Sequence, residues 1–98
     1  MNKNVVNERK DLLCECLVEI QNKEEAYEFL VDLCSVGEFE SLVQRVLVAQ
    51  KLKAGKMYAE IVEEVGASTA TISRVSHAWK ESNGYRKILE RIENKDVQ

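Results

Sequence analysis

Hydroxyl and basic side chains gather in one stretch of this 98-residue sequence, between residues 68 and 80. The polar members of the stretch are Ser68, Thr69, Thr71, Ser73, Arg74, Ser76, His77 and Lys80. On a helix, such side chains can hydrogen-bond to base edges in the major groove of DNA, and the free amides of the helix N-terminus can bind phosphate. These residue types and their spacing therefore predict recognition of double-stranded DNA.

Catalysis is a competing interpretation of the same stretch. Ser73, His77 and Glu81 follow one another at intervals of four, so a helix would place all three on one face. A catalytic triad also needs a group that orients the histidine from behind and donors that stabilise an oxyanion, and an exposed helix surface offers neither. Since His77 is the only histidine, a histidine-based metal site is equally unsupported. We therefore expect no enzymatic activity and no cofactor.

Two short helices have to position this stretch, and we predict them at residues 58–65 and 69–80. The apolar residues that face inward are Ile61, Val65, Ala67, Ile72 and Val75. Gly66 supplies the positive φ of the turn between the helices, which a Cβ atom would disfavour. Because two helices that cross near a right angle need this apolar pattern and a flexible turn, residues 58–79 are predicted to form a helix-turn-helix. Val62 departs from the pattern, since a small alanine is more usual there.

The outward side of the second helix carries the candidate contacts with DNA. Ser68 is the predicted N-cap, with its oxygen accepting from the backbone N–H of Thr71. Lys56 lies in an acid-free stretch ahead of the first helix, where it is expected to meet a phosphate. The full set of candidate DNA-binding residues is Lys56, Ser68, Thr69, Ala70, Thr71, Ser73, Arg74 and His77.

Helical periodicity extends over the rest of the chain and predicts an all-α protein of six helices. The other four helices are expected at about residues 7–21, 23–34, 38–54 and 85–93. The run Ser-Val-Gly at residues 35–37 interrupts the pattern, and the helix after it is apolar on nearly all sides, so it should be the most buried. We treat residues 1–98 as a single domain with a helical dimerisation core over residues 7–54.

The net charge of −3 at first sight opposes binding to nucleic acid. However, residues 1–40 carry ten acidic and four basic side chains, net −6, whereas residues 41–59 carry four basic and no acidic ones, net +4. Residues 67–80 are also free of acids and carry two basic side chains. A protein that is acidic overall can still present a local positive surface to phosphates, so the charge distribution permits DNA as a partner.

Apolar segments and cysteines indicate the cellular compartment in which the protein is expected. No apolar stretch reaches the ~18 residues that span a bilayer, and the polar N-terminus lacks the apolar segment of a signal peptide. The three cysteines, Cys14, Cys16 and Cys34, fit neither a CxxC site nor a disulfide framework. We therefore expect a cytoplasmic protein without membrane contact, in which the cysteines are small buried side chains.

The run GASTATISRV at residues 66–75 resembles the Trp repressor superfamily, and within it the YerC/YecD-type branch. The resemblance extends from about Leu12 to Ile92, which is most of the chain. It implies a six-helix fold in which two chains intertwine through their N-terminal helices as a homodimer. It also implies sequence-specific operator binding and repression of transcription. The family's contacts with bases and phosphates fall here on Ser68, Thr69, Ala70, Thr71 and Ser73.

The resemblance further bears on a small-molecule effector. In the Trp repressor, two arginines sandwich the indole of the corepressor tryptophan, and they match Arg45 and Arg74 here. Val75 stands where the family has a glycine, so its side chain should fill the space of the ligand, and Ala78 replaces a serine that contacts the ligand. Tryptophan is therefore not expected as a corepressor. Arg45 and Arg74 remain possible effector contacts, or else structural or DNA-facing cations.

Two functions from different classes follow from the sequence. The first is a homodimeric, sequence-specific transcriptional regulator. The alternative is a helical protein–protein interaction module that binds DNA weakly or not at all. Binding that depends steeply on salt would favour the first, because phosphate contacts release counterions whereas apolar protein contacts do not.

Overall fold

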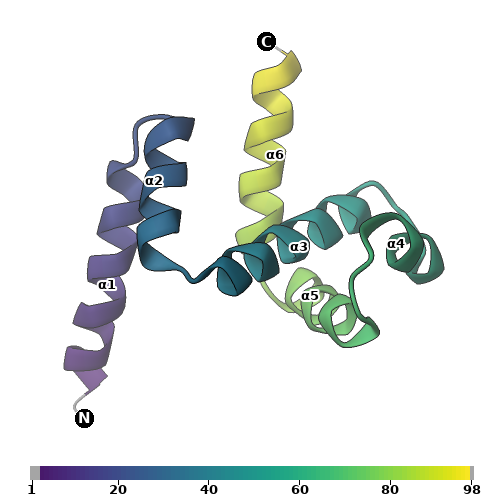
Figure 1. Cartoon of the computed structure of the whole chain (residues 1–98), viewed down its shortest axis with the longest axis horizontal. Coiled ribbons are helices and arrows are strands. Elements are labelled where there is room, and N and C mark those ends of the chain that lie inside the picture. The colour runs from purple at the N-terminus through teal and green to yellow at the C-terminus, as the bar shows by residue number, and fades with distance from the viewer. Residues whose placement is uncertain (1–2, 98) are drawn as a thin grey trace. The chain divides into compact units, whose positions relative to one another are not determined.

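A computed structural model describes residues 3–97 of the chain and the side chains of residues 7–95. It contains six helices and, within the described residues, no strand (Figure 1). The helices are α1 (Lys3–Glu19), α2 (Lys23–Leu33), α3 (Val36–Lys53), α4 (Tyr58–Val65), α5 (Thr69–Glu81) and α6 (Gly84–Val97). The prediction of an all-α, six-helix fold is thus confirmed.

The bounds of α3 differ from the prediction at its N-terminus. The hydroxyl of Ser35 accepts from the backbone N–H of Glu38 at 3.2 Å, and the Glu38 carboxylate accepts from the backbone N–H of Ser35 at 2.8 Å. This reciprocal pair is a capping box, and it lets Val36 and Gly37 form the first turn of the helix. The predicted interruption is therefore present but shorter than expected: it comprises Cys34 and Ser35, and Ser35 caps the helix that begins at Val36.

The last helix is longer than its apolar pattern indicates. It was predicted at about residues 85–93, with a frayed polar tail beyond, but α6 runs from Gly84 to Val97. Of the predicted tail, only Gln98 lies outside the described residues. Of residues 94–97, only Lys95 is a good helix former, so intrinsic propensity does not account for this extension.

The residues group into two compact units, one up to Phe39 and one from Glu40 onward. In the first unit, Asn22 caps α2, and the rings of Tyr27 and Phe39 pack with their centroids 5.5 Å apart. No described side chain of this unit is buried, and apolar ones such as Leu12 and Val18 are 63% and 81% exposed. The first unit therefore has an apolar surface but no core of its own.

The second unit holds the hydrophobic core, which is built from α3, α4, α5, α6 and the turn between α4 and α5. Its members are Val48, Ala49, Ile61, Ala67, Ile72, Val75 and Leu89. Val48 and Ala49 are the only buried residues of α3, and its apolar Val43 and Val46 stay exposed. The expectation that α3 is the most buried helix is not met, because the core of this unit covers only its C-terminal half.

Two further sequence expectations concern the cysteines and membrane spans. Cys14 is exposed and Cys16 and Cys34 are half-buried, so the prediction of three buried cysteines is wrong for the single chain. All three lie in or next to the helices of the first unit, which have no core to bury them. None of the described helices has the length and apolar character to cross a membrane.

Candidate nucleic-acid interface

The helix-turn-helix is held together by apolar side chains on its inner side. Ile61 of α4 and Ile72 of α5 are fully buried, and Val75 follows one turn further along α5. Ala67 lies in the turn between the helices and is also buried, where a larger side chain would push them apart. Val62 is exposed, so the valine in place of alanine does not lie in the core between the helices. Four of the five inward positions predicted from the sequence thus lie in this core, and the fifth, Val65, is half-buried and packs against it.

The turn between α4 and α5 has the backbone geometry that the sequence predicts. Gly66 has φ +75° and its N–H donates to the carbonyl oxygen of Val62 at 3.0 Å, which ends α4. The Ser68 hydroxyl accepts from the backbone N–H of Thr71 at 3.1 Å and donates to the Thr71 hydroxyl at 3.0 Å. Ser68 is therefore the N-cap of α5, as expected.

These bonds divide the candidate DNA-binding residues into two groups. The hydroxyls of Ser68 and Thr71 are hydrogen-bonded to each other, and this bond fixes the start of α5. The remaining candidates on α5 are all exposed, and they are Thr69, Ala70, Ser73, Arg74 and His77. Their spacing of three and four residues places Ala70, Ser73 and His77 on one side of the helix. The structure thus brings the α5 candidates together on a solvent-facing surface.

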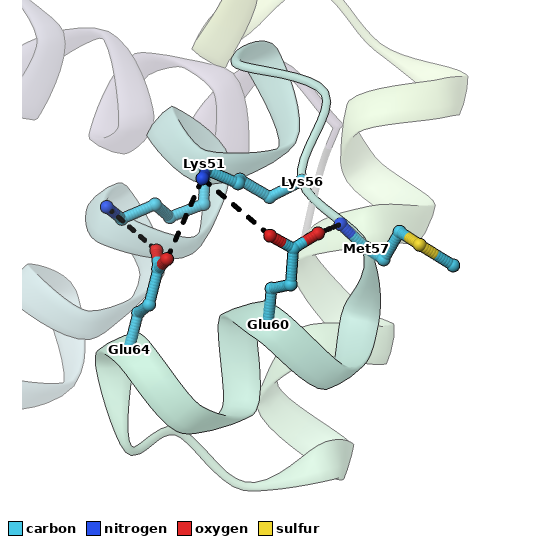
Figure 2. Close-up of polar contacts among 5 residues, drawn as sticks. All are labelled: Lys51, Lys56, Met57, Glu60 and Glu64. Atoms are coloured by element: carbon cyan, nitrogen blue, oxygen red, sulfur yellow. Dashed lines mark hydrogen bonds and ion pairs between the residues drawn. The ribbon is translucent and has the colours of Figure 1, made fainter.

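The candidate Lys56 lies apart from them, in an ion-pair network at the corner between α3 and α4 (Figure 2). Its Nζ is 3.7 Å from Glu60 Oε2 and 3.7 Å from Glu64 Oε1. Lys51 Nζ lies 3.0 Å from Glu64 Oε2. Glu60 also accepts from the backbone N–H of Met57 at 3.1 Å. Lys56 is thus already paired with two carboxylates, and a role at phosphate stays a prediction.

The network has electrostatic consequences for Glu64. The hydrogen bond from Lys51 is the main cause that lowers the pKa of Glu64 below its ordinary value. Desolvation opposes it, and the charges of Lys51 and Lys56 lower the pKa further. Sequence reasoning missed this network. The spacing of four between Lys56 and Glu60 is a visible signal, but Lys51 and Glu64 meet only after α3 and α4 have folded against each other.

A second missed feature connects α4 with α5 directly. The hydroxyl of Tyr58, at the start of α4, donates to the hydroxyl of Ser76 in the middle of α5 at 2.5 Å. Ser76 is 5% exposed and is the one polar residue buried within the described part of the chain. Tyr58 itself is 48% exposed, so this directional polar contact joins the buried side of α5 to a tyrosine at the margin of the apolar core.

The possible effector contacts do not form an evident binding site. Val75 is 1% exposed and belongs to the core, so the position where the family has glycine is filled by a packed side chain. Arg74 is exposed and Arg45 is half-buried. The residues present therefore do not fit an indole between the two arginines. Within residues 7–95, no group of three or more His, Cys, Asp or Glu side chains gathers that could hold a metal ion.

Comparisons with known proteins agree on one family. The family model described as Trp repressor protein matches residues 8–93. The uncharacterized protein YerC of Bacillus subtilis (strain 168) is 39% identical over 89 residues, which cover 90% of this chain and 86% of that protein.

Two solved structures are similar over nearly their whole length. One is the crystal structure of a proposed Trp repressor from Staphylococcus aureus, with 44% identity, a TM-score of 0.83, and coverage of 88% of this chain and 87% of that one. The other is a TrpR-like protein from Eubacterium eligens ATCC 27750, with 36% identity, a TM-score of 0.83, and coverage of 93% and 95%.

The ion-pair network predicts that Glu64 contributes to the acid sensitivity of the fold. A carboxyl whose pKa is lowered in the folded state stabilises the protein above its unfolded pKa, and this contribution is lost as the pH falls through the folded pKa. Glu64→Gln should therefore lower the melting temperature near pH ~7 but much less near pH ~3, which makes its melting temperature less dependent on pH.

Glu63→Gln is the matched control, because it removes the same charge from the neighbouring position of α4, where Glu63 is exposed. Thermal unfolding followed by circular dichroism over this pH range measures the effect. The same pH dependence in both variants would contradict the role assigned to the Lys51–Glu64 pair.

Proposed function

This chain belongs to the Trp repressor protein family, and on that premise we propose that it is a sequence-specific transcriptional regulator that recognises an operator through α5. The family is one of transcription regulators and not of enzymes. The observation that carries the proposal is the set of small exposed side chains on the first two turns of α5, which is anchored by a buried inner side. Such a protein acts on the chromosome, and we accordingly assign it to the cytoplasm.

The chemistry of the exposed α5 surface fits the major groove. The short side chains of Thr69, Ala70 and Ser73 allow the helix to approach the bases closely, where hydroxyls can bond to base edges and a methyl group can contact thymine. Arg74 can bond to guanine or to phosphate, and His77 follows on the next turn. The first amides of α5 lack helical partners and, together with the helix dipole, favour a phosphate. The surface therefore supplies both base contacts and backbone contacts.

A homodimer is the second part of the proposal. Many large apolar side chains are exposed in the single chain. Among them are Leu12, Leu13, Leu17 and Val18 of α1, Leu42, Val43, Val46 and Leu47 of α3, and Ile88 and Ile92 of α6. A monomer that leaves so many large apolar side chains in water is marginally stable, and a second copy can cover them. A two-fold dimer would present two α5 helices, which matches a near-palindromic operator.

Substitutions on α5 and at Lys56 separate base recognition from phosphate binding. Thr69→Ala and Ser73→Ala should each cost about 1–3 kcal/mol on the preferred operator and little on random DNA, because base contacts carry the specificity. Lys56→Ala should weaken binding to all sequences alike and reduce the salt slope by about one. The measurement is the affinity for operator and random duplexes over a range of salt concentrations, with folding checked by circular dichroism. If both α5 variants keep the wild-type ratio of affinities, α5 does not recognise the bases.

The oligomeric state gives a separate prediction. Sedimentation at micromolar concentration should yield about twice the 11.2 kDa of one chain, because the exposed apolar side chains need a partner. A folded monomer under these conditions would contradict the proposed dimer. Leu17→Lys offers a probe, since a charge on the apolar side of α1 should shift the equilibrium toward the monomer.

Tryptophan should have no effect on this protein. Because Val75 is part of the core, adding L-tryptophan should leave the operator affinity and the melting temperature nearly unchanged. A ligand present at about 1,000 times its dissociation constant would raise stability by about 4 kcal/mol. A clear rise in melting temperature with tryptophan, and not with alanine as the control amino acid, would show that a binding site exists.

A further inference from the structure

The contact between Tyr58 and Ser76 does more than fill space on the inner side of the helix-turn-helix. The other contacts there are apolar and come from residues such as Ile61, Ile72 and Val75. The hydrophobic effect is non-directional, so apolar packing defines the crossing of two short helices less sharply than a hydrogen bond between them can. A hydrogen bond requires a narrow range of distances and angles. The Tyr58–Ser76 bond is therefore the contact best suited to define one crossing geometry.

The placement of the two hydroxyls makes the bond sensitive to the orientation of α5. Tyr58 stands in the first turn of α4, and Ser76 lies in the middle of α5, away from the turn that already joins the helices. The bond and the turn thus hold α5 at two separated points, which restricts pivoting of α5 about the turn. If α5 pivots, Ser76 loses its partner inside the protein, and an unpaired buried hydroxyl is unfavourable.

We propose that the Tyr58–Ser76 hydrogen bond positions α5 for base recognition, so that it determines discrimination between DNA sequences more than affinity for DNA in general. The inference rests on the proposed function of α5. Base contacts need side chains within about 0.5 Å and 10–20° of the productive geometry. Long lysine side chains tolerate larger shifts when they contact phosphate. Tyr58 and Ser76 are in this sense positioning residues, acting through Thr69, Ala70 and Ser73.

Removal of either hydroxyl tests the proposal with little change of shape. Tyr58→Phe and Ser76→Ala should each weaken binding to the preferred operator by about fivefold, the effect of one net hydrogen bond, and leave binding to a random duplex unchanged. The double variant should lose no more than the larger single effect, because the two hydroxyls act as a pair. Ser82→Ala is the control, because it removes a hydroxyl that donates at 2.8 Å to the Ala78 carbonyl oxygen at the other end of α5. This variant should keep the wild-type ratio of operator affinity to random-DNA affinity.

Amide hydrogen exchange of the free protein separates positioning from simple stabilisation. In Tyr58→Phe, exchange should accelerate about fivefold for the amides of α4 and the first half of α5, and not for those of α6. Equal acceleration of all slow amides would mean that the bond only adds global stability, and unchanged rates would mean that it restrains nothing. Either result overturns the proposal.

The affinity ratios distinguish failure of this inference from failure of the proposed function. If the wild-type protein prefers no operator over random DNA, α5 is not a recognition helix and both proposals fail. If the wild-type protein discriminates and Tyr58→Phe discriminates equally well, the proposed function stands and the positioning role is refuted.

Discussion

The burial of Ile61, Ile72 and Val75 in one core is the constraint on which the candidate interface depends. A helix of eight residues such as α4 is too short to persist in water by itself, so tertiary packing has to stabilise it. The same packing decides which side of α5 faces solvent, because the inward positions of a helix fix the outward ones. The exposed surface around Ser73 is thus a consequence of the core, and the polar side chains could vary there without loss of the fold.

The polar contacts of the second unit refine this arrangement at its ends. Gly55, with φ +81°, lies at the end of α3. Its N–H donates to the carbonyl oxygen of Leu52, and the N–H of the next residue donates to that of Lys51. The lysine side chains at this corner then form ion pairs with carboxylates of α4. Ser68 and Thr71 fix the start of α5 in the same local manner. The first unit is different, because it lacks a core and exposes apolar side chains. This contrast agrees with the function proposed above, in which the second unit presents α5 to DNA and the first unit packs against a second copy of the chain.

The sequence predicted best where the determining signals are local. The bounds of α4 agree with the structure because Gly66 and Ser68 mark its end and the next start within a few residues. The interruption predicted at residues 35–37 lies instead at Cys34 and Ser35, because the Ser35–Glu38 capping box, an equally local signal, starts α3 ahead of Gly37. The Lys51–Glu64 pair and the Tyr58–Ser76 bond join residues 13 and 18 positions apart, and no periodicity reports such contacts. The exposure of the apolar side of α3 could not be predicted from the sequence either, because it depends on which other segments pack against that side.

Protection of guanine N7 from methylation by dimethyl sulfate tests most directly whether α5 enters the major groove of a two-fold operator. N7 lies on the major-groove edge of guanine, so a helix bonded there blocks the reagent. On a duplex selected from a random pool by this protein, we expect two protected patches about one helical turn apart, one for each α5 of a dimer. A selected duplex with no protected guanine, or with a single patch, would contradict the account.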